Sequence, residues 1–141
     1  KLALDKYGTE TSKWEEDRPL LCAAVLHLSD ISNQAKPFKL ANVWAHRILS
    51  EFFKQGDREA ALQLPISPLC NRHTTSVPTS QVMFIKYIVL PAYLTLADLL
   101  PEVGVTCIKH LRETLYQWTL RASGGHKQAV KGHKGRAGRR S

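Results

Sequence analysis

The chain has 141 residues, and 43% of them are apolar, which is enough for a hydrophobic core in one modest domain or in part of a larger one. Its net charge is +8, but six of the 20 basic residues lie in residues 122–141, which contain no acidic residue. The first 121 residues are therefore nearly neutral, which argues against a nucleic-acid-binding surface on the folded part.

The sequence also bears on the membrane and on the redox state. Uninterrupted apolar runs stay well below the ~18 residues of a membrane span, so we predict no transmembrane segment. The apolar stretch 20–28 is short and follows acidic residues, unlike a secretory signal peptide. The three cysteines are widely spaced and form no CxxC pair, which predicts buried free thiols. We expect a cytoplasmic protein, either free or part of a larger membrane-associated one, and because the sequence begins at Lys1 we expect a piece of a longer chain.

The first 54 residues are predicted to form an irregular segment and two helices. Residues 1–19 are polar and mixed in charge, so we expect an upstream segment that is partly loop. Pro19 suits the first turn of a helix, and nearly all-round apolarity over residues 20–28 predicts a helix central to a larger bundle. After a break at Pro37, apolar side chains spaced by four residues predict a second helix over residues 40–54.

The middle of the chain is predicted to contain a chain reversal, a long loop and a third helix. Gly56 suits the left-handed position that ends a helix. Residues 65–77 contain two prolines and several hydroxyl residues, which predicts an irregular connection of a length that is often functional. A third helix is predicted to begin at Thr79 or Ser80 as N-cap and to be kinked at Pro91.

The last helix is predicted over residues 103–121. It places four apolar side chains on one face, those of Ile108, Leu111, Leu115 and Trp118. Residues 122–141 are rich in glycine and basic residues, so we expect a basic disordered tail there. That tail is also compatible with a contact to nucleic acid or an anionic membrane, but it contains no aromatic residue for base stacking, and we predict no specific nucleic-acid partner. The chain as a whole is predicted to be all-α.

Six blocks of residues carry a resemblance to a known family. They are His27-Leu-Ser-Asp30-Ile-Ser-Asn33 with Lys36-Pro37, Trp44, Glu51-Phe52-Phe53, Gln55-Gly56-Asp57, Ser67-Pro68 with Cys70, and Ser80-Gln81 with Phe84-Ile85. The first block resembles the H-x-x-D-x-x-N-x-x-K-P segment of class I cyclic-nucleotide phosphodiesterases, and the others follow in the order and spacing of that family. Residues 20–121 are accordingly identified as the C-terminal part of its catalytic domain.

The resemblance implies part of a multi-helix, HD-domain-like bundle that hydrolyses cAMP or cGMP to the 5′-monophosphate in signal transduction. It also implies two divalent metal ions, zinc with magnesium or manganese, which lower the pKa of the attacking water and neutralise the transition state. The HNxxH and HDxx motifs that hold those metals in the family do not occur in this sequence, and neither does its general-acid histidine. We therefore expect no turnover from these residues alone, and we expect no catalytic residue among them.

Asp30 matches the last metal-ligating aspartate of the family, and His27 lies one helical turn before it as a candidate supporting residue. Taken without the resemblance, the same two residues also fit an ordinary hydrogen-bonded pair on a packed helix. One carboxylate does not hold two catalytic metals, because such sites need several protein ligands.

The resemblance also assigns a substrate-binding pocket. It comprises Gln81, Phe84, Asn33, Ile48, Phe52 and Leu69. An amide offers one donor and one acceptor, so Gln81 is able to pair with the edge of either purine, while Phe84 stacks on the base. From the residues alone, Ile48 and Phe52 also fit a helix core, and Gln81 also fits an ordinary first-turn position.

Three residues depart from the family pattern, namely Asn71, Met83 and Lys86. Asn71 stands where an aspartate is usual, so we expect an oxygen acceptor to remain and an ion pair to be lost. Met83 replaces a small residue, and we expect it to crowd the helix packing or tilt Phe84. Lys86 replaces an acidic residue. These departures leave open a second hypothesis, that the chain is a catalytically inactive helical module. The oligomeric state and the cAMP or cGMP preference are not predicted.

Overall fold

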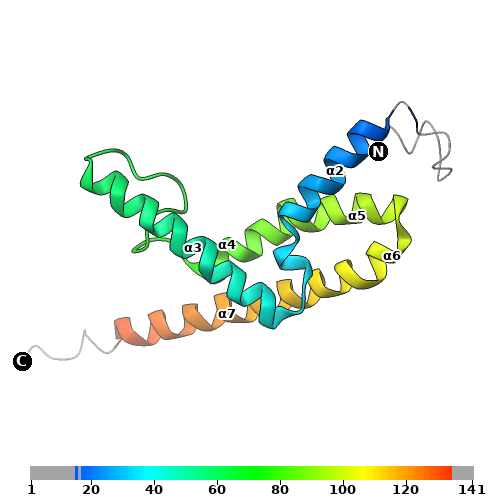
Figure 1. Cartoon of the computed structure of the whole chain (residues 1–141). Helices are drawn as coiled ribbons and strands as arrows, with labels where there is room; N and C mark the ends of the chain where they lie inside the picture. Colours follow the sequence, from blue (N-terminus) through cyan, green and yellow to red (C-terminus); the bar gives the residue numbers. More distant parts are fainter. Residues whose placement is uncertain (1–14, 16, 135–141) are drawn as a thin grey trace, which may run out of the picture.

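The computed structural model describes residue 15 and residues 17–134, with side chains up to residue 124. This part of the chain is helical and contains no strand, which confirms the all-α prediction. Figure 1 shows the arrangement: α4 and α5 form one long rod, α6 turns the chain back, and α7 runs beside that rod. Helix α3 crosses this hairpin, and α2 projects from it beside the start of α5.

Helix α2 (Arg18–Asp30) begins with Pro19 in its first turn, as predicted. The expectation that this helix is central concerns a larger bundle; among the described residues Leu28 is its one buried residue, whereas Leu26 is 73% exposed. The Tyr93 hydroxyl donates a hydrogen bond to the Leu28 carbonyl (2.9 Å), and burial raises the pKa of that phenol. The helix is therefore attached near its C-terminal end and leaves most of its apolar surface uncovered.

A short 3₁₀ turn, η2 (Ser32–Ala35), leads through Pro37 into α3 (Phe38–Ala61). The predicted end of this helix at Gly56 is wrong, because the helix continues for another turn. A Cβ atom on Gly56 would lie 2.1 Å from the carbonyl oxygen of Cys70, so glycine permits the loop to approach the helix there. The chain reverses only after the helix, where Gln63 has a φ of 58°.

The third predicted helix is observed as α4 (Val77–Phe84), a π-helical turn η3 (Ile85–Val89) and α5 (Leu90–Leu99). Its N-cap is Ser76, whose hydroxyl accepts from the amide of Thr79 (3.4 Å), so the predicted cap at Thr79 or Ser80 was too late. The irregularity expected at Pro91 takes the form of the π turn directly before it, which accommodates the missing proline N–H.

This long rod, Val77–Leu99, is long and apolar enough to cross a membrane by length and composition, which differs from the expectation that no segment would be. Length and composition are weak grounds for a membrane span, because core helices of soluble proteins meet the same criterion. Here Ile85 and Val89 belong to the same core cluster as Leu111 and Trp118 of α7. The rod is therefore the element around which the hydrophobic core of this chain is built.

The chain then passes through α6 (Pro101–Val103) and a π turn η4 (Gly104–Ile108) into α7 (Lys109–Lys134). The predicted apolar face is confirmed, since three of its four members are buried and Leu115 packs against them. The helix continues beyond the expected start of a disordered tail at residue 122. Residues 135–141, like residues 1–14 and 16 of the predicted upstream segment, lie outside the described part.

Candidate functional site

A cavity of about 180 Å³ lies between the end of α2, η2, α3, the loop 62–76 and α4. Its lining residues are Asp30, Ile31, Asn33, Gln34, Ile48, Leu49, Phe52, Leu69, Ser80, Gln81 and Phe84. Seven of the eight site residues predicted from the sequence are among them, and His27 is the exception. The volume is below the ~300 Å³ lower limit of pockets for drug-sized ligands, so the cavity suits a planar base rather than a whole nucleotide.

Two apolar side chains from α3 and one from α4 form walls of this cavity. Ile48 and Phe52 lie one helical turn apart, and Phe84 enters from α4. The alternative that Ile48 and Phe52 are core residues does not hold, because Ile48 is half-buried and Phe52 is 36% exposed. The core face of α3 is instead formed by Ala41, Ala45 and Leu49. Ile48 and Phe52 thus form a wall outside the core face of α3, whereas Phe84 also packs against the core.

Two polar side chains at the cavity have unused hydrogen-bonding capacity. Gln81 is 7% exposed, and its amide makes no hydrogen bond to any residue in the described part of the chain. The Oδ1 atom of Asn33 is buried and likewise finds no partner among residues 17–124. A buried polar atom without a partner carries a free-energy penalty, which a ligand that supplies the missing hydrogen bond removes. The Asn33 oxygen is such an atom, and the Gln81 amide, which lines the same cavity, is free to pair with a ligand.

The predicted metal site, formed by Asp30 with His27 in support, is much less complete than the cavity. Asp30 lines the cavity, but it is exposed and its carboxylate has no hydrogen-bond partner within the described residues. His27 is exposed as well and is not joined to Asp30 by a hydrogen bond, so neither the supporting role nor the packed pair expected for it is seen. No group of three or more His, Cys, Asp or Glu side chains able to hold a metal occurs in the described part. These residues do not fit a two-metal centre.

Gln34 is a cavity residue that the sequence analysis missed. It is buried, its Nε2 donates to the Ala41 carbonyl (3.5 Å), and its Oε1 accepts from Nε1 of Trp118 (3.4 Å). The Trp118 ring is itself packed edge-on against Phe38, with centroids 5.4 Å apart. Gln34 therefore links the cavity floor to α7. Its position beside Asn33 in the first matched block was the available signal.

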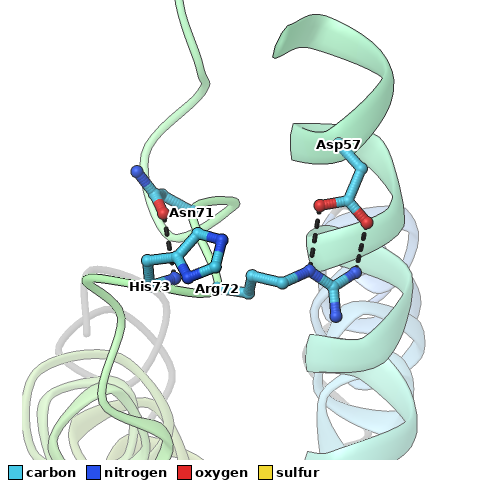
Figure 2. Close-up of polar contacts among 4 residues, drawn as sticks. All are labelled: Asp57, Asn71, Arg72 and His73. Atoms are coloured by element: carbon cyan, nitrogen blue, oxygen red, sulfur yellow. Dashed lines mark hydrogen bonds and ion pairs between the residues drawn. The ribbon is translucent and has the colours of Figure 1, made fainter. Parts of the chain in front are cut away.

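Asn71 keeps the expected oxygen acceptor, as Figure 2 shows. Its Oδ1 accepts from the backbone amide of His73 (2.9 Å), which closes a local turn. The neighbouring Arg72 reaches α3, where Nε donates to Oδ1 of Asp57 (2.9 Å) and Nη2 donates to Oδ2. This hydrogen-bonded pair lowers the pKa of Asp57 and raises that of Arg72. Both side chains are exposed, so the pair fastens the loop only weakly.

The expected crowding by Met83 is wrong. Its side chain is 52% exposed and lines a second, open groove of about 740 Å³ on the other side of Leu69 and Phe84. The groove is completed mainly by hydroxyl residues of the loop and by Tyr87 and Ile88. Lys86 is also exposed, with its Nζ atom 5.1 Å from the centre of the Tyr87 ring. Neither substitution disturbs the core.

The cysteines are free, and they differ in burial. Cys70 is buried as predicted, whereas Cys107 is half-buried and Cys22 is exposed. Burial, followed by the nearby charge of Glu59, raises the pKa of the Cys70 thiol. The Cys70 side chain is therefore an unreactive packing group beneath the loop.

Comparisons with known proteins point to one family. The sequence model of the 3′,5′-cyclic nucleotide phosphodiesterase family matches residues 2–111. Rat 3′,5′-cyclic-AMP phosphodiesterase 4C is 47% identical over 98 residues, which are 70% of this chain and 17% of the rat protein. Human dual specificity calcium/calmodulin-dependent 3′,5′-cyclic nucleotide phosphodiesterase 1C is 43% identical over 98 residues, or 70% of this chain and 14% of that protein.

A solved structure shows the same fold. The phosphodiesterase domain of the Salpingoeca rosetta rhodopsin phosphodiesterase superposes with a TM-score of 0.78 at 24% identity, covering 86% of this chain and 37% of that one. The chain thus spans well under half the length of the relatives and structures that it matches. Its helices, its ordered motifs and the match over residues 2–111 together show that the chain belongs to the 3′,5′-cyclic nucleotide phosphodiesterase family.

Proposed function

We propose that this chain forms the purine-binding side of the catalytic domain of a cyclic nucleotide phosphodiesterase, a hydrolase that converts cAMP or cGMP to the 5′-monophosphate. The observation that carries this proposal is the convergence of seven predicted residues, from the end of α2, η2, α3, the loop and α4, on one base-sized cavity. The names of the relatives, which are cAMP-specific and dual-specificity phosphodiesterases, support it over an inactive helical module.

In the proposed complex the purine lies between Phe84 on one side and Ile48 with Phe52 on the other. A planar ring in such a slot gains burial and dispersion on both faces. The Gln81 amide then pairs with the polar edge of the base. Because no described residue fixes that amide, both of its orientations are open, which supports binding of adenine and guanine alike.

The exposed apolar surface of α2 supports a larger domain around this chain. Leu20 and Leu26 are largely exposed, and exposed apolar patches of this kind mark contact surfaces. We propose that other parts of the complete catalytic domain cover this face. The expected zinc and magnesium or manganese ions would need further ligands, because Asp30 is the one acidic side chain that the described residues bring to the cavity. We derive no catalytic step from the described residues.

Binding of product nucleotides to the purified 141-residue chain tests the proposal. In titrations of ¹⁵N-labelled chain with AMP and with GMP, we expect both ligands to shift the amide signals around Gln81 and Phe84. Gln81→Ala is expected to raise the dissociation constant about tenfold, because a hydrogen bond to a largely buried amide is lost. Gln117→Ala, which removes the same side chain from α7 away from the cavity, is the matched control.

Two results would contradict the proposal. One is an unchanged dissociation constant in Gln81→Ala, and the other is the absence of signal changes around the cavity at millimolar AMP and GMP. Hydrolysis of cAMP by the isolated chain with Mg²⁺ and Zn²⁺ would contradict the view that the metal ligands lie outside it.

A further inference from the structure

Leu69 has an unusual backbone conformation, and its side chain lines the candidate site. Its side chain lines both the cavity and the neighbouring groove, so together with Ser80 and Phe84 it forms the partition between them. Its φ is 67°, in the left-handed region that a leucine rarely adopts. Non-glycine residues persist there when the surrounding structure over-determines them. Something next to Leu69 therefore holds its backbone in place.

The local turn accounts for part of this constraint. The Cys70 amide donates to the Ser67 carbonyl (3.0 Å), which closes a four-residue turn over residues 67–70. Pro68 stands at the second position and Leu69 at the third, where a type II turn requires a positive φ and normally has glycine. A leucine at that position supplies a wall side chain that glycine lacks, but the turn then needs external support.

That support comes from the last turns of α3. The carboxylate of Glu59 accepts three hydrogen bonds: from the Ser67 amide (2.7 Å), the Ser67 hydroxyl (2.7 Å) and Nε2 of Gln55 (2.8 Å). Hydrogen bonds to an ionised carboxylate are among the stronger ones in proteins. At the other end of the turn, the Cys70 carbonyl rests against Gly56. The turn is thus fastened to α3 on both sides of Leu69.

We propose that Glu59 is a positioning residue for the base cavity: by holding Ser67 it fixes the turn 67–70 and sets Leu69 as the wall between cavity and groove. The inference rests on the proposed function only in taking a purine nucleotide as the ligand. Glu59 itself lines neither space, so it acts on the ligand through the leucine.

Two variants of the 141-residue chain separate this role from general stability. Glu59→Gln is expected to raise the AMP dissociation constant roughly fivefold, because the wall is no longer pre-organised. Asp57→Asn, the matched control, removes the same charge from the same helix but releases only the exposed Arg72, and we expect a change of less than about twofold.

A double-mutant cycle measures whether the effects of Glu59 and Leu69 on AMP affinity are coupled, which a residue that only stabilises the fold would not show. If Glu59 acts through the leucine, Glu59→Gln has no further effect on AMP affinity once Leu69→Ala has removed the wall. Additive effects in the cycle, an unchanged affinity in Glu59→Gln, or an equal loss in Asp57→Asn would each overturn the proposal. Should Glu59→Gln not fold, Ser67→Ala, which deletes one of the three bonds, undergoes the same comparison.

A ligand-free measurement keeps the outcome distinct from that of the proposed function. The three-bond HN–Hα coupling and ¹³C shifts of Leu69 report its left-handed conformation in wild type and in Glu59→Gln. Loss of that conformation in the variant supports the positioning role even if the wild type binds no AMP. Absence of AMP binding would contradict the proposed function but not the positioning role. Retention of it in Glu59→Gln, with Ser67 still protected from amide exchange, overturns the role.

Discussion

The base cavity and helix α2 meet at Asp30, but this chain completes them to very different extents. The loop that carries Leu69 is held to α3 at Gly56 and at Glu59. Helix α2 is held near one end by Leu28 and exposes its apolar side chains and its acidic terminus. The difference supports the proposal that the described residues contribute a base-binding pocket, whereas no group of three or more side chains able to hold a metal occurs among them.

The largest expected change in stability that tests this difference is at Gly56. Gly56→Ala places a Cβ atom against the Cys70 carbonyl, and we expect a loss of about 3 kcal/mol in the free energy of unfolding because the backbone of the loop must move. Gly124→Ala is the control, since nothing lies within 4 Å of its added Cβ, and it should stabilise α7 by about 0.5–1 kcal/mol. Urea denaturation measures both, and equal effects would contradict the close approach.

A smaller effect distinguishes the attached and unattached faces of α2. Leu28→Ala should cost about 2–3 kcal/mol, because its side chain belongs to the core and is 7% exposed. Leu26→Ala, on the uncovered face, should change the free energy of unfolding by less than about 0.5 kcal/mol. Similar losses in the two variants would show that this chain covers α2 in solution.

The smallest effect concerns pH. The hydrogen bonds from Gln55 and Ser67 hold the pKa of Glu59 below its ordinary value of 4.5. A carboxyl group with a lowered folded pKa stabilises the fold above its ordinary pKa and loses this contribution as the pH falls through the lowered value. We therefore expect the urea midpoint to fall on acidification below pH 4.5, and less so in Glu59→Gln.

The pH measurement needs one control, because Arg72 also lowers the pKa of Asp57. The comparison is therefore made in an Asp57→Asn background. There Glu59 is the remaining carboxylate that holds the loop 62–76 to α3. An identical pH dependence with and without the Glu59→Gln change would show that its carboxylate does not hold the loop.

The candidate site residues were predicted through the resemblance, because helical periodicity alone also fitted Ile48 and Phe52 to a helix core. The structure brings both of them to one cavity with Gln81 and Phe84. Leu69 could be assigned through the resemblance, but its left-handed backbone could not be, since the turn of residues 67–70 normally takes glycine at that position.

Other features could not be predicted because they depend on residues distant in sequence. A glycine at position 56 is typical of a helix end, but this one lies inside α3. Glycine is required there because the Cys70 carbonyl approaches the helix closely, which the sequence does not reveal. The all-round apolarity of α2 predicted a helix central to a larger bundle, and within the described part only Leu28 of this helix is buried. Proline favours a break in a helix, but the rod continues through Pro91 with a π turn just before it. Local propensity alone does not predict this continuation.

The most direct test of the central claim is to locate a bound base by intermolecular NOEs in a complex of the chain with AMP. The account predicts contacts from the purine H2 and H8 protons to the Phe84 ring and the Ile48 methyl groups. It also predicts none to Met83 or Tyr87 in the neighbouring groove. Contacts confined to the groove residues would contradict the assignment of the cavity as the base site.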